Sequence, residues 1–181
     1  MGDLIVVVAY EPEWPHLFAE LGANLRGVLG SVAVRIDHIG STAIPGMAAK
    51  PVIDVQISVG AFAPLDAFRM PLAELGFLYR AGNPDLSKRY FREAPGTRRT
   101  HIHVRLAGSW SEQFALLFRD YLREHEAEAA WYSGVKMRLA EQFGDDREDY
   151  TNAKAWYLWE IMKKADPWHQ ETGRIPGPSD A

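Results

Sequence analysis

The sequence predicts an α+β protein in which helices flank a mixed β-sheet and a helical part follows. Over residues 1–108, runs rich in β-branched residues alternate with amphipathic runs. From residue 109 onward, apolar residues recur at helical spacing. The length of 181 residues suits one compact domain, or a domain with an appended helical part, and argues against two separate cores. We expect an α+β core over 1–108, a helical part over 109–166 packed on it as one unit, and a flexible Pro/Gly-rich tail over 167–181.

The first part is predicted to contain five strands and two helices. Pro51 stands at the first position of one strand, where its missing N–H matters least. Pro71 is expected to interrupt the second helix, and Gly76 to close it. In chain order, the expected elements are a buried strand over 4–10, a helix over 11–30, strands over 31–40 and 50–60, a helix over 64–77, and strands over 87–94 and 99–107.

Three helices are predicted in the second part. The first, over 109–126, begins at Ser109, a residue suited to a helix N-cap, and carries an aromatic stripe on one face. The others are expected over 129–143 and 147–165. In the first of these helices, Arg119, Asp120 and Arg123 are expected to form structural ion pairs on the helix surface.

Composition excludes several classes of site. The chain has no cysteine, which rules out thiolate nucleophiles, disulfides and cysteine-bound zinc. A net charge of -4 argues against general nucleic-acid binding, which needs clustered cations. The apolar run near the start is too short to span a bilayer and lacks a basic flank. A cytoplasmic protein with no membrane partner is the expectation.

Two of the predicted strands carry one polar face each. Because side chains alternate across a strand, Asp54, Gln56 and Ser58 share one side of the 50–60 strand. His101 and His103 share one side of the 99–107 strand in the same way. Solvent exposure explains such alternation equally well, but two imidazoles on one face also suit a metal ion.

The segment "GSTAIPG" between two strands suggests a phosphate-binding turn. Glycine permits close approach of backbone N–H groups, and the hydroxyls of Ser41 and Thr42 add donors. The segment is not a Walker A loop, since Met47 follows Gly46 where that motif needs lysine. A plain turn is the more common explanation of such a segment.

Two lysines follow tyrosines by one helical turn. Tyr132 precedes Lys136, and Tyr150 precedes Lys154. Lys154 falls within an apolar stripe, where a lysine either extends its amine to water or directs it toward an anionic ligand.

Several of these segments together resemble the GrpB-like family, a distant relative of the nucleotidyltransferase fold. The resemblance covers nearly the whole chain. It rests on "YEPEWP", "HIGSTAIPGMAAKPVIDV", "RYF", "HIHV", "FRDYLR" and the two Tyr-x-x-x-Lys helices. Family domains of this kind also occur fused behind dephospho-coenzyme A kinase.

The resemblance implies a nucleotidyltransferase-like fold and half of its site. Gly40 and Ser41 match the phosphate-gripping turn, and Asp54 matches the first metal-binding acid. Gln56 stands where the second acid is expected, and the later strand offers histidines in place of a third acid. Imidazole ligands favour Zn²⁺ or Mn²⁺ over Mg²⁺.

We therefore expect a cleft that binds a nucleotide or another phosphorylated small molecule. Asp54 is the expected catalytic residue, nucleotidyl transfer to a small acceptor is the expected reaction, and the divalent metal is Mg²⁺, Mn²⁺ or Zn²⁺. A non-catalytic ligand-binding or partner-assisting module is the alternative, and a metal-dependent hydrolase is a third. The expected phosphate-binding residues are Gly40, Ser41, Thr42, Lys50, Arg89, Lys136 and Lys154, and the expected metal ligands are Asp54, His101 and His103.

Overall fold

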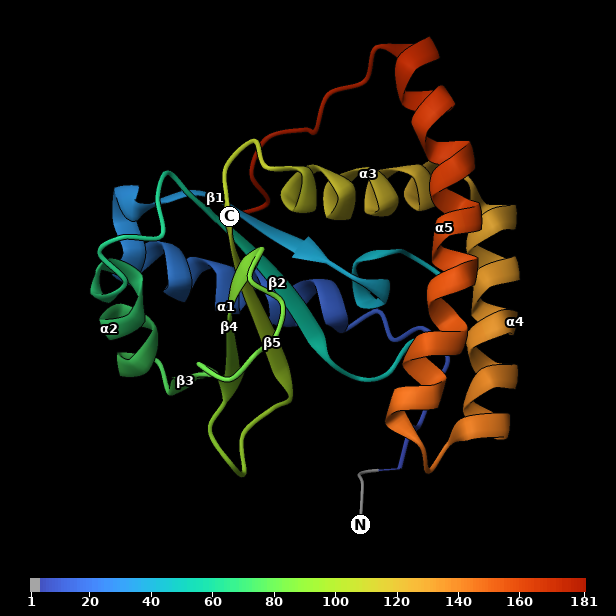
Figure 1. Ribbon diagram of the computed structural model, residues 1–181, viewed down its shortest axis with the longest axis horizontal. Coiled ribbons are helices and arrows are strands. Elements are labelled where there is room, and N and C mark those ends of the chain that lie inside the picture. The colour runs from blue at the N-terminus through green and yellow to red at the C-terminus, as the bar shows by residue number, and fades with distance from the viewer. Residues whose placement is uncertain (1–3) are drawn as a thin grey trace.

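A five-stranded mixed sheet forms the centre of the protein (Figure 1). A computed structural model describes residues 4–181. The strand order is β1-β2-β5-β4-β3; β2 and β5 are parallel, and the other neighbours are antiparallel. The strands are β1 (Ala33–Ile39), β2 (Ile53–Val59), β3 (Phe77–Tyr79), β4 (Lys88–Glu93) and β5 (Thr100–Leu106). The mixed sheet confirms the predicted fold class.

One face of the sheet packs on two helices, α1 (Trp14–Leu29) and α2 (Asp66–Glu74). The apolar residues of β2 and β5 point toward this side, as strand alternation predicts. Phe18 and Leu25 of α1 and Phe68 of α2 are fully or almost fully buried there. This face holds the first hydrophobic core.

Three further helices lie beyond the other face and enclose a second core; the first of them packs on β1 and β5, and the other two pack on it and on each other. They are α3 (Trp110–Glu124), α4 (Glu126–Phe143) and α5 (Arg147–Thr172), and α4 and α5 run side by side in Figure 1. Ser109 caps α3 by accepting a hydrogen bond from the Glu112 N–H. The core between these helices contains Tyr132, Tyr150 and Ile161, each at most 2% exposed. The expectation of a single core is therefore wrong, because the three helices bury apolar surface among themselves.

A buried ion cluster ties α3 to the polar face of the sheet. The Arg119 guanidinium lies 2.7 Å from Asp120, 3.5 Å from Asp37 and 2.8 Å from Asp180. Arg35 adds a second cation to Asp37 at 2.7 Å. Burial opposes the charge of Arg119, but the carboxylates outweigh it and raise its pKa. The expected ion pairs of Arg119 and Asp120 therefore exist, but inside the protein rather than on a helix surface.

The segment 4–10 is not a strand of the sheet, which corrects the prediction. It makes one isolated bridge, between Val8 and Ala49, and the Ile5 N–H donates to the Gly144 carbonyl. Leu4 and Val6 are 67% and 50% exposed. Its β-branched composition favours extended backbone, but neither edge of the sheet receives it.

Two further boundaries differ from the prediction. Helix α2 continues through Pro71, because Phe68 and Leu72 bury their side chains fully and offset the lost backbone hydrogen bond. The short strand β3 directly after Gly76 was not expected; it pairs with β4.

The predicted flexible tail is partly helical and partly bound to the sheet. Helix α5 continues to Thr172, seven residues beyond the predicted end at 165. Farther on, Ser179 and Ala181 bond to the backbone of Ile36 in β1 at 2.8–3.1 Å. The Asp180 carboxylate accepts from the His38 N–H at 2.9 Å. The composition of this segment gave no sign of these long-range bonds.

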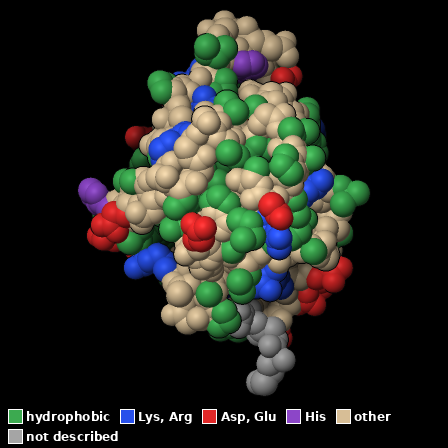
Figure 2. Space-filling model, turned by 90° about the vertical axis from the view of Figure 1, so that its left-hand side faces the viewer, with side chains coloured by type: hydrophobic (Ala, Val, Ile, Leu, Met, Phe, Trp, Pro, Cys, Tyr) green, Lys and Arg blue, Asp and Glu red, His purple; other side chains and the backbone are tan. Residues whose placement is uncertain are grey.

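Surface charge and helix length are consistent with the composition. On the face shown in Figure 2, basic and acidic side chains are interspersed rather than gathered into one basic patch. Within residues 4–181, no helix combines the length and the apolar character needed to cross a bilayer.

Replacing Arg119 by alanine should lower the free energy of unfolding by about 3–5 kcal/mol, because buried carboxylates lose their central cation. Urea denaturation of the whole chain measures this. The control is Arg69→Ala, which breaks an exposed pair with Asp66 and should change the free energy of unfolding far less. Equal losses in the two variants would contradict the structural role given to the cluster.

Candidate functional site

Parallel pairing of β2 with β5 brings one carboxylate and two imidazoles together. Asp54 lies opposite His101 in the register, and Gln56 opposite His103. Asp54 Oδ1 is 3.1 Å from His101 Nδ1 and 3.5 Å from His103 Nε2. The polar faces predicted for the two strands thus meet as one polar surface.

The surroundings of Asp54 and His103 set the charge states of these two groups. Burial alone would raise the pKa of Asp54, but hydrogen bonds from the two histidines outweigh it and hold that pKa far below its usual range. Burial lowers the pKa of His103 to about 4, although Asp54 opposes this. At neutral pH the structure therefore presents a carboxylate beside a neutral His103 ring.

This group has the donors of a divalent-metal site. One ligand atom from each of Asp54, His101 and His103 lies within 4.8 Å of the others. Because the Asp54 carboxylate can only accept, its hydrogen bonds place the protons on His101 Nδ1 and His103 Nε2. Within residues 4–181, the other ring nitrogens, His101 Nε2 and His103 Nδ1, are buried without a hydrogen-bond partner. One carboxylate with two imidazoles suits Zn²⁺ or Mn²⁺ better than Mg²⁺. The residues present therefore fit such a metal, and among residues 4–181 no second carboxylate joins Asp54 in this group.

Gln56 has a structural role where the family resemblance implies an acid. Its side chain is fully buried, accepts a hydrogen bond from Arg105 and donates to the Glu112 carbonyl at 3.4 Å. Both ends of the amide are therefore engaged, and they join the sheet to the start of α3. His103, which lies opposite Gln56 on β5, supplies a possible metal-ligand atom instead.

The Gly40 turn lies directly against Asp54. Gly40 has a positive φ of 71°, and a Cβ there would lie 2.7 Å from Asp54 Oδ2. Only glycine allows this approach. Thr42 points inward, where its hydroxyl donates to the Val52 carbonyl at 3.1 Å and lies 3.0 Å from His38 Nε2. Ser41 is the hydroxyl of this turn that meets a charged side chain.

Lys136 contacts that hydroxyl, and Lys50 and Lys154 lie close enough to lower the pKa of Lys136 beyond the effect of burial. Lys136 Nζ donates to Ser41 Oγ at 2.8 Å and to the Ala48 carbonyl, and is 3% exposed. Lys50 and Lys154 lie over the ring of Tyr150, with Nζ 5.2 Å and 5.7 Å from its centre.

The part of the chain that the structure describes pairs none of these lysines with a carboxylate. Within residues 4–181, none of the three amines has a carboxylate oxygen within 4.0 Å. Burial and the neighbouring cations lower the pKa of Lys50 to about 8. The same two causes lower the pKa of Lys136 well below its usual range, and burial lowers that of Lys154. Such a concentration of buried positive charge is what an anionic ligand would relieve.

A cavity of about 560 Å³ joins the lysines to the carboxylate and imidazoles. Ligand sites of small molecules have about this size. Lys88 and Tyr90 of β4, with Arg147 of α5, also line it, and they were not among the predicted site residues. Tyr90 lies opposite His103 in the sheet. Strand alternation places Lys88, two residues earlier, on the same face, so this pattern in the sequence could have identified both residues. The predicted residues that line the cavity are Gly40, Ser41, Thr42, Lys50, Asp54, His101, His103, Lys136 and Lys154.

Arg89 does not belong to this group, which corrects its predicted place. It pairs in register with Val104, on the opposite face of the sheet. Its guanidinium carbon lies 4.1 Å from the ring centre of Phe62. Alternation within "KRYF" places Lys88 and Tyr90 in the cavity and Arg89 outside it.

Comparison with known proteins assigns the chain to a family. A family profile described as GrpB protein matches residues 4–164. The chain belongs to the GrpB family.

Named relatives of this GrpB chain include UPF0157 proteins and dephospho-CoA kinases. The UPF0157 protein BH1888 of Halalkalibacterium halodurans is 33% identical over 90% of this chain and 83% of its own length. A dephospho-CoA kinase of Mycolicibacterium paratuberculosis is 34% identical over 94% of this chain. The match spans only 48% of that kinase.

Solved structures agree with the family and extend the fold comparison. The crystal structure of conserved protein GrpB from Enterococcus faecalis superposes with a TM-score of 0.81 at 32% identity, over 88% of this chain and 96% of that one. Cid1 in complex with its short product ApU superposes with a TM-score of 0.52 at 13% identity, over 81% of this chain and 48% of Cid1. The second likeness shows that the GrpB chain shares the nucleotidyltransferase-like fold.

Replacing Gly40 by alanine should disturb the site as well as the turn. The added Cβ meets Asp54 Oδ2 at 2.7 Å, whereas the same change at Gly46, which also has a positive φ, meets nothing within 4 Å. Both variants should lose about 1–3 kcal/mol of unfolding free energy from backbone strain. Only Gly40→Ala should also weaken binding of Mn²⁺, measured by calorimetric titration. Equal Mn²⁺ affinity in the two variants would show that Gly40 does not position Asp54.

Proposed function

We propose that this GrpB protein binds a nucleotide, or a similar phosphorylated small molecule, together with one divalent metal ion. The observation that carries the proposal is the convergence on one cavity of Lys50, Lys136 and Lys154, none of which has a carboxylate partner among residues 4–181. The adjacent Asp54, His101 and His103 offer one set of metal-binding atoms. Cations and a metal site in one cavity suit a phosphate chain better than any neutral ligand.

Each part of the cavity has its own task in this proposal. Ser41 accepts from Lys136, and its own O–H is free to donate to a phosphate oxygen. The lysines neutralise the phosphate charge, and their lowered pKa values rise again when the anion arrives. A metal held by Asp54, His101 and His103 would supply further charge neutralisation at the phosphates.

The reaction that best suits this arrangement is nucleotidyl transfer to a small acceptor. An acceptor oxygen forms a bond to the α-phosphorus of a nucleoside triphosphate, and the bond from that phosphorus to the bridging oxygen breaks. Pyrophosphate leaves, and the acceptor proton passes to solvent. Asp54 contributes by positioning the ligands, because its depressed pKa makes it a weak base.

A non-catalytic binding module is the second candidate, and Gln56 favours it. The amide replaces an expected acid and is fully engaged with Arg105 and Glu112. One carboxylate gives a metal less negative charge than two do. The match to half of a dephospho-CoA kinase is consistent with a module that assists another protein.

Metal binding tests the proposal directly. Asp54→Ala and His103→Ala should each weaken binding of Mn²⁺ and Zn²⁺ by more than about 100-fold, since a lost ligand costs more than a lost supporting bond. His16→Ala, at an exposed position of α1, is the matched control and should leave the affinity unchanged. Calorimetric titration supplies the affinities, and unaltered binding in the Asp54 and His103 variants would refute the site.

The same samples separate the two candidate functions. ATP and Mn²⁺ are supplied with a panel of small hydroxyl compounds, and pyrophosphate release is followed. Release that depends on Asp54 supports transfer. Binding of ATP without release from any member of the panel supports the module.

Anion binding should weaken as the pH rises through about 8. A phosphate chain needs the ammonium form of Lys50, and the pKa of Lys50 in the free protein is lowered to about 8. Below that pH the lysine is already charged, and above it binding requires proton uptake. The affinity for ATP should therefore fall about tenfold between pH 7 and pH 9.

Variants at two lysines identify the source of that pH dependence. Lys50→Met should bind ATP more weakly and with a shallower pH profile. Lys163→Met removes a 69% exposed lysine that pairs with Glu160, and should leave the profile as it is. A pH-independent affinity in the unaltered protein would be incompatible with the proposed anion site.

A further inference from the structure

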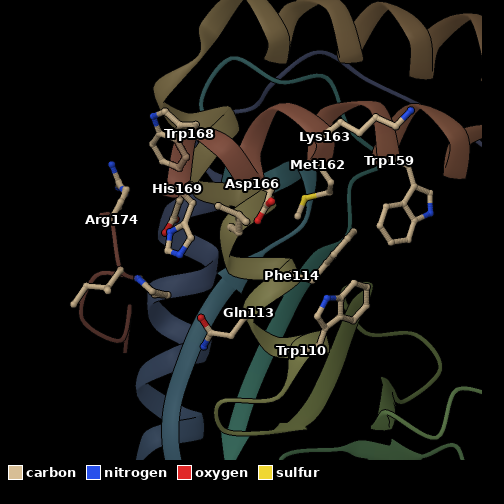
Figure 3. Close-up of a pocket in the computed structure, with 14 residues that line it drawn as sticks. Trp110, Gln113, Phe114, Trp159, Met162, Lys163, Asp166, Trp168, His169 and Arg174 are labelled. Carbon is tan, nitrogen blue, oxygen red and sulfur yellow. The ribbon is translucent and has the colours of Figure 1, made fainter. Parts of the chain in front are cut away.

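A second cavity lies beyond the contact between α3 and α5, outside the candidate site. It measures about 580 Å³ and is bounded by α3, α5 and residues 174–176 of the tail (Figure 3). Phe114 of α3 lines both cavities. No residue of the proposed metal or phosphate site lines this second cavity. Its chemistry is therefore separate and calls for a different ligand.

One side of the second cavity is aromatic. The ring centres of Trp110 and Phe114 lie 4.9 Å apart, and those of Phe114 and Trp159 lie 5.4 Å apart. Trp110 and Trp159 are 68% and 50% exposed, although both are large apolar side chains. Figure 3 shows Trp110 and Phe114 from α3 near Trp159 from α5. A planar ring stacked here would remove this aromatic surface from water.

A buried carboxylate also lines the cavity. Asp120 is 5% exposed, and its Oδ1 accepts from Arg119 Nε at 2.7 Å. Within residues 4–181, its other oxygen, Oδ2, has no hydrogen-bond partner. A second carboxylate, Asp166, extends from α5 and accepts from Gln170 at 2.9 Å. Free acceptor capacity beside an aromatic wall suits a ligand that donates hydrogen bonds.

Two basic residues also line this cavity, but they do not make it a site for an anion. Lys163 pairs with Glu160 at 2.5 Å, and Arg174 pairs with Glu124 at 2.9 Å. Both cations are therefore already matched at exposed positions. Asp120 is itself paired with Arg119, so what remains for a ligand is its second oxygen together with the carboxylate of Asp166, which has no cation within 4.0 Å among residues 4–181.

We propose that this cavity binds a planar aromatic compound that carries a cationic amino group. The ring packs against Trp110, Phe114 and Trp159, and the amino group donates to Asp120. This site does not depend on the proposed nucleotide site, and loss of one leaves the other intact.

A matched pair of indole compounds tests the proposal. Tryptamine and indole-3-acetate share the ring and differ in the sign of the side-chain charge. Calorimetric titration of the whole chain should show tryptamine binding and an affinity for indole-3-acetate weaker by about tenfold or more, as expected for a hydrogen bond to a charged group.

Three tryptophan variants locate the binding. Trp110→Ala and Trp159→Ala should each weaken tryptamine binding about three- to tenfold, the range expected for a lost aromatic pair. Trp156→Ala removes a tryptophan that is 61% exposed and does not line the cavity, and should change nothing. Asp120→Asn should narrow the difference between the two compounds. Asp120 also pairs with Arg119, so the tryptophan variants test the site even where Asp120→Asn unfolds.

Other outcomes would overturn the proposal. They are equal affinity for both compounds, no detectable binding of either, or the same loss with Trp156→Ala. Self-association of the chain in light scattering that Trp110→Ala abolishes would assign the aromatic surface to contact between copies instead.

Discussion

The polar face of the sheet lies under helices, so each polar group on it needs a partner inside the protein. Most of these groups have one. Asp37 has Arg119 and Arg35, and Gln56 has Arg105. Within residues 4–181, the exceptions are four buried atoms without a hydrogen-bond partner, namely His101 Nε2, His103 Nδ1, Arg105 Nε and Ser58 Oγ, and the three lysines without a carboxylate within 4.0 Å. All of these residues except Ser58 line the cavity of the candidate site. The same demand for partners that fixes α3 on the sheet thus also singles out the cavity in which the proposed ligand would lie.

The chain topology brings these charged groups together. Two parallel neighbouring strands need a long connection, and in the sequence α2, β3 and β4 lie between β2 and β5. The crossover places His101 beside Asp54, 47 positions earlier in the sequence. On the helical side, α4 brings Lys136 to the Ser41 turn, 95 positions away. The candidate site is therefore assembled from segments that are distant in sequence, and it depends on the complete fold.

Local patterns predicted the parts of the site but not everything that meets there. Alternation in β2 and β5 was sufficient to place Asp54, His101 and His103 on polar faces, and the same rule applied to β4 would have exchanged Arg89 for Tyr90. Arg147 carries no local signal, because only the packing of α5 over the sheet brings it to the cavity. In the segment 4–10 a local signal was present but misleading. Its residues favour a strand, but it does not join the sheet and makes a single bridge.

The segment 177–181 also affects whether the edge of the sheet can pair with another chain. Strand β1 is an edge strand, and the bonds from Ser179, Asp180 and Ala181 occupy backbone groups of Ile36 and His38 that would otherwise be open to another chain. The opposite edge, β3, is only three residues long and offers little backbone to pair with. One edge is thus covered and the other is short, which are two established defences against edge-to-edge aggregation. By covering the β1 edge, the Pro/Gly-rich segment therefore opposes aggregation of the protein, a property distinct from ligand binding.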